Sequence, residues 1–185
     1  MMRSKLFGVL GLGVLAMMGL AACATPPPSG ALSSGAQRPV TGRDLRIVTG
    51  QTVYVPAYSE VFLGRENLST ELAVTLAVHN TDLDAPIIIE SVGYYDTDGN
   101  LVTDYIDGDP VELSPLATTG YVVPEGEGSG GWGSNFVVIW GAEEPVHEPV
   151  IEAFMVSTTG LSGISAISIG RVISQTGAGE VASGE

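Results

Sequence analysis

The feature that most restricts the fold of this chain is a two-residue alternation of apolar and smaller or polar side chains. It is clearest between positions 71 and 78, where the apolar positions are Leu72, Val74, Leu76 and Val78. Successive side chains of a strand point to opposite faces, so this spacing predicts a half-buried β-strand. The one stretch that could suggest a helix, residues 143–155, contains Pro145 and Pro149, which oppose a helix. The pattern predicts an all-β chain.

Further apolar runs follow, separated by residues that favour turns. They cover Ile87–Tyr94, Leu101–Val102, Val111–Leu113, Leu116–Val123, Phe136–Trp140, Val150–Val156 and Ile164–Ile173. Asp96–Asn100 carries the Asp and Gly residues of a hairpin turn. Short runs at this spacing predict an antiparallel β-sandwich, immunoglobulin-like in outline, of about seven to nine strands. We expect this domain to cover residues 47–174, and residues 175–185, rich in Gly, Ala and Ser, to be a disordered tail.

The N-terminus has the features of an export signal. Arg3 and Lys5 precede an uncharged apolar run, residues 6–20, which is shorter than the roughly 20 residues needed to span a bilayer. The sequence then reads Leu20, Ala21, Ala22, Cys23. Residues 1–22 therefore resemble a bacterial lipoprotein signal peptide with its lipobox. The resemblance implies cleavage before Cys23 and a diacylglyceryl thioether on that residue. The alternative is an ordinary signal peptide beside an incidental Cys.

Residues 23–46 are expected to form a flexible tether, because they are poor in bulky apolar groups and rich in Pro, Ser and Gly. A tether of this length reaches at most about 75 Å. We expect an exported, lipid-anchored protein that faces the periplasm. Position 24 is Ala rather than Asp. By resemblance to the known sorting rule, this favours the outer membrane over the inner one.

Charge and composition exclude several functions. The chain has 7 Lys and Arg against 21 Asp and Glu, and its formal net charge is −14. Such a surface repels phosphate, so no nucleic acid partner is expected. Lys5 is the only Lys, so a chain cleaved before Cys23 has no Lys for Schiff-base or phosphate chemistry. Cys23 is the only Cys, which excludes an intramolecular disulfide.

Acidic residues between positions 96 and 112 form a candidate calcium site. The oxygen-bearing candidates are Asp96, Asp98, Asn100, Asp104, Asp107 and Asp109, with Glu112 beside them. Calcium takes six to eight oxygen ligands at short range, which such a cluster could supply. The spacing is not that of an EF-hand loop. The alternative is a pair of solvated turns at 96–100 and 107–110.

The segment 124–135 is a Gly-rich loop that contains Trp132 and Asn135. Glu125 and Glu127 argue against phosphate binding there. Trp132, Asn135 and Tyr95 are the candidates for a contact with an envelope protein or a carbohydrate. In the alternative, the loop is a long connection and Trp132 folds back over the end of the sandwich.

Five phrases, taken in order, identify a known family. They are Val53–Ser59, Val78–Thr81, Val92–Tyr95, Leu113–Leu116 and Gly130–Phe136. With these phrases the chain resembles a bacterial family of exported proteins catalogued as domain of unknown function 3124, over about residues 48–173. The resemblance implies one compact domain, and it implies no catalytic residue, ligand or partner.

No catalytic arrangement emerges from the sequence. His79 and His147 are far apart, and no Gly-x-Ser-x-Gly nucleophile motif is present. We therefore expect a membrane-anchored lipoprotein that is not an enzyme and that binds or scaffolds another envelope component. It would have no cofactor apart from the lipid on Cys23. A calcium-binding module is the alternative, and a hydrolase is a weaker one.

Overall fold

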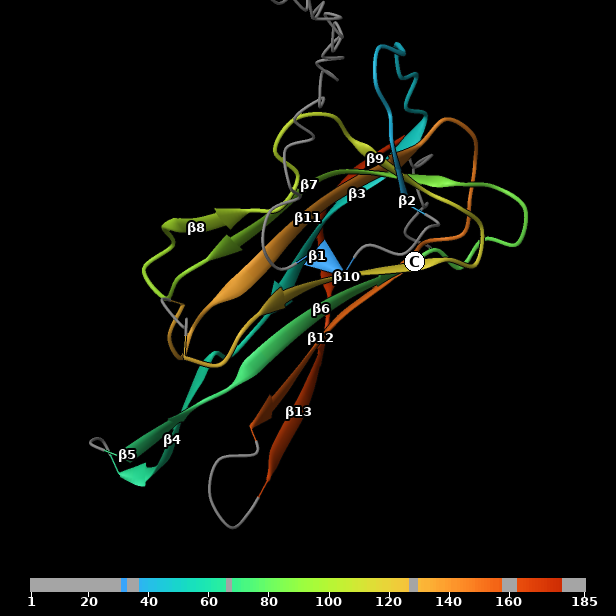
Figure 1. Cartoon of the computed structure of the whole chain (residues 1–185). Helices are drawn as coiled ribbons and strands as arrows, with labels where there is room; N and C mark the ends of the chain where they lie inside the picture. Colours follow the sequence, from blue (N-terminus) through green and yellow to red (C-terminus); the bar gives the residue numbers. More distant parts are fainter. Residues whose placement is uncertain (1–30, 33–36, 66–67, 127–129, 158–162, 178–185) are drawn as a thin grey trace, which may run out of the picture.

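The computed structural model describes residues 31–32, 37–65, 68–126, 130–157 and 163–177 (Figure 1). These residues form strands and connecting loops without a helix, and every strand pair is antiparallel. The predicted all-β antiparallel sandwich is confirmed. No membrane-spanning helix lies within the described ranges. Leu20, Ala21, Ala22 and Cys23 lie outside them.

The first sheet has five strands in the order β1-β10-β6-β12-β13. Their bounds are β1 Ala31–Leu32, β6 Ala73–His79, β10 Thr118–Val123, β12 Val150–Ser157 and β13 Ile164–Ile169. The alternation in the sequence is that of β6 and the residue before it. Leu72, Val74, Leu76 and Val78 are at most 1% exposed, as a half-buried strand requires.

The second sheet has seven strands. Six follow the order β14-β3-β11-β7-β9-β2, and β8 also pairs with β7. The bounds are β2 Gln37–Pro39, β3 Thr49–Pro56, β7 Ile87–Tyr95, β8 Leu101–Asp104, β9 Val111–Leu113, β11 Asn135–Ala142 and β14 Arg171–Thr176. A separate hairpin of β4 (Glu60–Arg65) and β5 (Leu68–Glu71) extends from the end of β3 (Figure 1).

The number of strands differs from the prediction. The described residues form fourteen strands instead of seven to nine. β1, β2 and β5 have two to four residues each, too few for an alternation to be visible in the sequence. The predicted strand over Ile164–Ile173 is in fact two strands, β13 and β14, which meet at Gly170 and belong to different sheets.

Gly170 allows the chain to cross from one sheet to the other. A Cβ atom at this residue would lie 2.6 Å from Cγ1 of Val53 and 2.8 Å from the carbonyl oxygen of Ile151. Real Cβ atoms essentially never approach other atoms this closely. The crossing therefore depends on a residue without a side chain.

The core lies between the sheets and contains a cluster of four aromatic rings. The ring centroids of Tyr94 and Phe136 are 4.9 Å apart, and those of Tyr105 and Tyr121 are 5.2 Å apart. Tyr105 also lies 6.3 Å from Phe136. These tilted contacts join rings of β7 and β11 in the second sheet to β10 in the first. They add about 0.5–1.5 kcal/mol each to the apolar burial.

The segment predicted as a tether is partly folded. β1 pairs with β10, and β2 pairs with β9. Arg38 contacts Glu112 at 2.7 Å, and Arg43 contacts Glu143 at 2.8 Å. The sequence pattern gave no sign of this because backbone pairing needs no apolar side chains. From Cys23 to Ala31 the chain reaches at most about 28 Å, far less than the length expected for the whole segment.

Candidate functional site

Asn80, which follows β6, organises one end of the sandwich. Its side chain is buried, and Nδ2 donates hydrogen bonds to the carbonyl oxygens of Ala85 (2.9 Å), Leu113 (3.2 Å) and Ser114 (3.1 Å). Its Oδ1 accepts the backbone N–H of Asp82 at 3.0 Å. Asn80 therefore joins the β6–β7 loop to the β9–β10 loop. Asn80 and Ser114 belong to two of the phrases on which the family resemblance depends.

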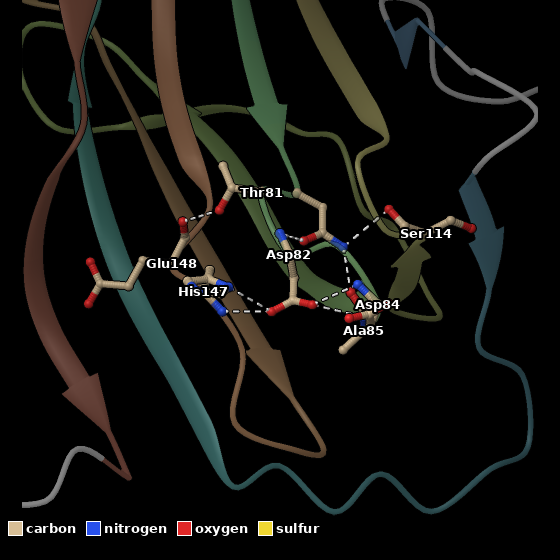
Figure 2. Close-up of polar contacts among 8 residues, drawn as sticks. Thr81, Asp82, Asp84, Ala85, Ser114, His147 and Glu148 are labelled. Carbon is tan, nitrogen blue, oxygen red and sulfur yellow. Dashed lines mark hydrogen bonds and ion pairs between the residues drawn. The ribbon is translucent and has the colours of Figure 1, made fainter.

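Asp82 joins the same loop to a third one (Figure 2). One carboxylate oxygen, Oδ1, accepts the backbone N–H groups of Asp84 (3.0 Å) and Ala85 (2.9 Å). The other, Oδ2, accepts the backbone N–H of His147 at 2.9 Å and lies 3.2 Å from its Nδ1. The backbone N–H groups, first that of Asp84 and then those of His147 and Ala85, hold the pKa of Asp82 well below its usual range.

A third contact completes this end network, which we define as Asn80, Thr81, Asp82, Ser114, His147 and Glu148. The Thr81 hydroxyl donates to the carbonyl oxygen of Glu148 at 2.7 Å (Figure 2). The sequence analysis did not single out Asp82. The available signal was the Asn-Thr-Asp run directly after a strand, because such side chains cap turns by bonding nearby backbone groups.

The end network places an imidazole beside a carboxylate, an arrangement that also occurs in hydrolases. Here the His147 side chain is 79% exposed, and three of the four contacts of the Asp82 carboxylate are with backbone N–H groups. His79, the other histidine, contacts Thr118 through Nδ1 at 2.8 Å. The geometry is that of a clamp between loops.

The first of the predicted calcium ligands form a hairpin turn between β7 and β8. Oδ1 of Asp96 accepts the backbone N–H groups of Asp98 (2.9 Å) and Asn100 (2.8 Å), and Oδ2 accepts Nδ2 of Asn100 at 2.9 Å. These bonds, above all that from the Asn100 side chain, lower the pKa of Asp96. Gly99 completes the turn with a φ of +83°. The predicted hairpin turn is present.

Two further predicted ligands bond to separate partners, one in its own loop and one in the N-terminal segment. Asp104 accepts the backbone N–H of Ile106 at 3.1 Å, and Asp109 accepts the Thr41 hydroxyl at 2.8 Å. Across the described ranges, no three His, Cys, Asp or Glu side chains gather into a group that could hold a metal ion. The structure therefore gives the calcium hypothesis no support.

A cavity of about 360 Å³ lies where the N-terminal segment meets the sandwich. Its lining residues are Arg43, Pro86, Ile88, Glu112, Glu143 and Glu144. Arg43 lies 2.8 Å from Glu143 and 3.6 Å from Glu112. Two of the carboxylates in the wall are thus ion-paired with the segment that leads into the domain. We interpret this cavity as a junction between segments.

The opposite end of β11 carries the Gly-rich loop, which is held in place on one side by Ser59. The carbonyl oxygen of Gly131 accepts both the N–H and the hydroxyl of Ser59 at 3.2 Å. The hydroxyl of Ser134 donates to the carbonyl oxygen of Ala57 at 2.6 Å. Ser59 and Ser134 are buried. Trp132 lies between these fixed residues.

Thr97, in the turn after β7, holds the other side of the loop. Its N–H and its hydroxyl both donate to the carbonyl oxygen of Gly130 at 2.9 Å, and its Oγ1 accepts the N–H of Gly133 at 3.0 Å. Gly131 has a φ of +78°, and a Cβ atom at Gly130 would collide with the hydroxyl of Tyr94. The glycines allow the loop to pack this closely.

The loop leaves Trp132 57% exposed. This exposure differs from the alternative in which the ring covers the end of the sandwich. Asn135 and Tyr95, the other predicted contact residues, are direct cross-strand partners in β11 and β7. The structure thus brings Tyr95 and Asn135 together, and Asn135 follows Trp132 by three residues in the chain.

The sequence analysis missed exposed apolar residues next to Ser59 and in the β4–β5 hairpin that follows it in the chain. Tyr58, next to Ser59, is 40% exposed, and Phe62, Leu63 and Leu68 of the β4–β5 hairpin are 45–50% exposed. The available signal was the run Val61-Phe62-Leu63 just before Gly64. We define the Trp132 end as Tyr58, Phe62, Leu63, Leu68 and Trp132.

Comparison with known families assigns the chain. A family model described as "Protein of unknown function (DUF3124)" matches residues 50–173. The chain belongs to this family. The match spans β3 to β14 with the end network and the Trp132 end, so the resemblance in the sequence is confirmed.

A comparison with curated proteins finds no match. One solved structure, "Crystal Structure of Thermotoga maritima 1070", is 13% identical and has a TM-score of 0.38. The alignment covers 65% of this chain and 92% of that one.

Proposed function

We propose that this DUF3124 chain is a lipid-anchored, non-catalytic protein of the bacterial envelope that binds another protein through the Trp132 end. The observation that carries the proposal is an exposed Trp on a loop fixed by hydrogen bonds to Thr97, Ser59 and Ser134. Aromatic anchors dominate the binding energy of many protein interfaces. A segment that is already fixed, as residues 130–134 are, loses less conformational entropy on binding.

The surroundings of Trp132 favour a protein over a carbohydrate partner. Sugar recognition combines a stacked ring with polar groups that bond the sugar hydroxyls. Around this Trp, the hydroxyls of Thr97, Ser59 and Ser134 bond to carbonyl groups of the loop and its neighbours. The exposed side chains of Phe62 and Leu68, in the hairpin that follows Ser59 in the chain, are apolar. Exposed apolar side chains together with an aromatic anchor fit a protein partner better than a sugar.

The anchor is proposed on Cys23, after removal of residues 1–22. Each buried methylene of a lipid chain adds about 0.8 kcal/mol, so two or three chains make release from the membrane very slow. The distance of at most about 28 Å between Cys23 and Ala31 keeps the domain close to the bilayer. A partner that lies in the same membrane, or near it, is therefore within reach. We place the protein on the periplasmic side, with the outer membrane favoured.

Site-specific photo-crosslinking in intact cells tests the binding proposal. A photo-reactive residue replaces Trp132 in one strain, and Leu83, in the β6–β7 loop and 66% exposed, in a control strain. A chain cleaved before Cys23 has no Lys, so amine-reactive reagents are unsuitable. We expect mass spectrometry to find one envelope protein enriched with position 132 and absent with position 83. Equal, background capture at both positions would overturn the proposal.

Substitutions of the two tryptophans distinguish the loss of a partner contact from the loss of folding stability. Trp132→Ala should change the free energy of unfolding by at most about 0.5 kcal/mol, because the ring is exposed. Trp140→Ala, at a residue 2% exposed, should cost about 3–5 kcal/mol. Loss of capture in a stable Trp132→Ala protein then reports a lost contact. Retained capture would exclude Trp132 as the anchor.

Intact-mass analysis of protein from the native host tests the anchor separately. We expect the mass of a chain that begins at Cys23 with attached acyl chains, recovered in the membrane fraction. An unmodified Cys23 on protein from the soluble fraction would contradict the anchoring proposal.

A further inference from the structure

A second surface lies along β13 and β14, at the edges of both sheets. β13 is the last strand of the first sheet, and β12 is its neighbour among the described residues. β14 is the last strand of the second sheet on its own side. Both belong to one run of chain that crosses between the sheets at Gly170. An edge strand presents unpaired backbone N–H and C=O groups that can pair with another strand.

The side chains of this edge are apolar and exposed. Ile167 and Ile169 of β13 are 71% and 74% exposed, the highest values among the large apolar residues described. Phe154, the cross-strand partner of Ile167 on β12, is 40% exposed. Ile173 on β14 is 60% exposed. Exposed apolar patches of this kind mark interaction sites more often than isolated exposed residues do.

The charge pattern indicates which partner fits this edge. The chain carries a formal charge of −14, yet it contains no Asp or Glu from Ala153 to Gly179. The one charged residue in that stretch is Arg171. Two copies of such an acidic chain repel one another over most of their surfaces. β13 and β14 carry no acid, and Glu152 of β12 is the cross-strand partner of Ile169 at one end of β13. Two copies can therefore approach closely along the rest of that edge.

We propose that β13 pairs edge to edge, antiparallel, with β13 of a second copy of this chain. The five-stranded sheets of the two copies then form one continuous sheet. β13 carries none of the usual features that block such pairing: its sequence, Ile-Ser-Ala-Ile-Ser-Ile, has no Pro and no charged residue. Pairing about a two-fold axis uses the same edge of both copies, so the assembly closes as a dimer.

A second copy fits this edge better than a lipid surface does. Hydrocarbon would accept Ile167 and Ile169, but it leaves the edge N–H and C=O groups without hydrogen-bond partners, at a cost of several kcal/mol each. Another β13 satisfies these groups and covers the isoleucines at once. The dimer edge shares no residue with the Trp132 end.

Single-cysteine crosslinking of the full chain in intact cells tests the dimer. Cys23 is the only native Cys, so the unsubstituted chain gives the background. The reporters are Ser165→Cys, Ala166→Cys, Ile167→Cys, Ser168→Cys and Ile169→Cys, so that both faces of β13 are sampled. The control is Leu83→Cys, whose exposure of 66% is close to that of the isoleucines. In an antiparallel two-fold pair, one residue of β13 faces its own copy. We therefore expect an oxidant to give disulfide-linked dimers mainly at one reporter, severalfold above Leu83→Cys.

A second substitution tests the charge argument. Adding Ile169→Asp to the Ser165→Cys or Ile167→Cys reporter should reduce its crosslinking severalfold, since it places two acids close to the pair axis. Equal crosslinking at all reporters and at Leu83→Cys would mean random collision and would overturn the proposal. Absence of dimers would also overturn it. In that case, the thiols are labelled with a water-soluble maleimide. Labelling without detergent indicates that the edge is free. Labelling that requires detergent indicates that lipid or another protein covers it.

Discussion

The carboxylate of Asp82 accepts the backbone N–H of His147, 65 positions further along the chain, at 2.9 Å. The same carboxylate accepts two N–H groups of its own loop, from Asp84 and Ala85. One buried side chain therefore fixes the β6–β7 loop to the β11–β12 loop. A tie of this kind acts on the folded state alone, so it should appear in the stability of the protein and in its pH dependence.

Asp82→Asn should lower the stability of the protein and weaken its dependence on acid. The pKa of Asp82 is lower in the folded state than its ordinary value of 3.8. The stabilisation is therefore complete above about pH 4–5 and is lost as the pH falls below 3.8 toward the folded-state pKa. Denaturant unfolding at a series of pH values between 6 and about 2.5 measures this, and we expect a flatter profile for the variant than for the parent.

His147→Ala tests whether the Asp82 carboxylate is held by the backbone N–H of His147 or by its imidazole. This variant keeps the backbone N–H that bonds to Asp82, and the side-chain contact is the weakest of the causes that lower the pKa of Asp82. We expect most of the acid dependence to remain. A profile as flat as that of Asp82→Asn would show that the imidazole, and not the backbone, holds the carboxylate.

Asn80→Ala should be among the most destabilising polar substitutions. The side chain is 2% exposed, and its removal leaves three carbonyl groups without their donor. Unsatisfied buried groups cost about 1–3 kcal/mol each, and partial relaxation makes a total loss of about 3 kcal/mol our expectation. Asn100→Ala, which removes one bond to the exposed Asp96, is the control and should cost less than about 1 kcal/mol. Chemical unfolding that ranks the two variants equally would contradict the end network.

Local patterns in the sequence predicted the features that depend on neighbouring residues. The alternation at Leu72–Val78 depends on the two faces of one strand, and the turn at Asp96–Asn100 depends on side chains two to four residues from the bonded N–H groups. Both are present as predicted. The class of fold followed from these elements because period and turn residues repeat along the chain.

The unpredicted features arise from contacts between distant segments. Asp82 and His147 come together because three loops meet at one end of the sandwich, and no spacing in the sequence encodes that meeting. The crossing at Gly170 depends on the packing of Val53 and Ile151 around it. The apolar residues of the Trp132 end were overlooked because the exposure of Phe62 and Leu68 is set by the direction of the hairpin.

Gly170→Ala should destabilise the protein by about 2 kcal/mol, the usual cost of forcing an extra carbon into a packed site. The added Cβ meets Val53 at 2.6 Å and the backbone oxygen of Ile151 at 2.8 Å, and the backbone atom has little freedom to move. Gly163→Ala is the matched control, because its Cβ has an ordinary contact of 3.7 Å with the carbonyl oxygen of Ser157. Denaturant unfolding should place Gly163→Ala within about 0.5 kcal/mol of the parent. Equal effects would show that the crossing tolerates a side chain.

Tyr121 should make the protein sensitive to alkali. Its ring is buried in the aromatic cluster, and burial raises the pKa of its phenol to about 12 from 10.0. Between these values the folded state holds a proton that the unfolded state has lost, so stability falls as the pH rises. The expected loss between pH 9 and 11 is about 1 kcal/mol. Tyr121→Phe keeps the ring and removes the titrating group, so its unfolding free energy should fall by that much less over the same range. Parallel profiles for the variant and the parent would show that the phenol titrates alike in the folded and unfolded states.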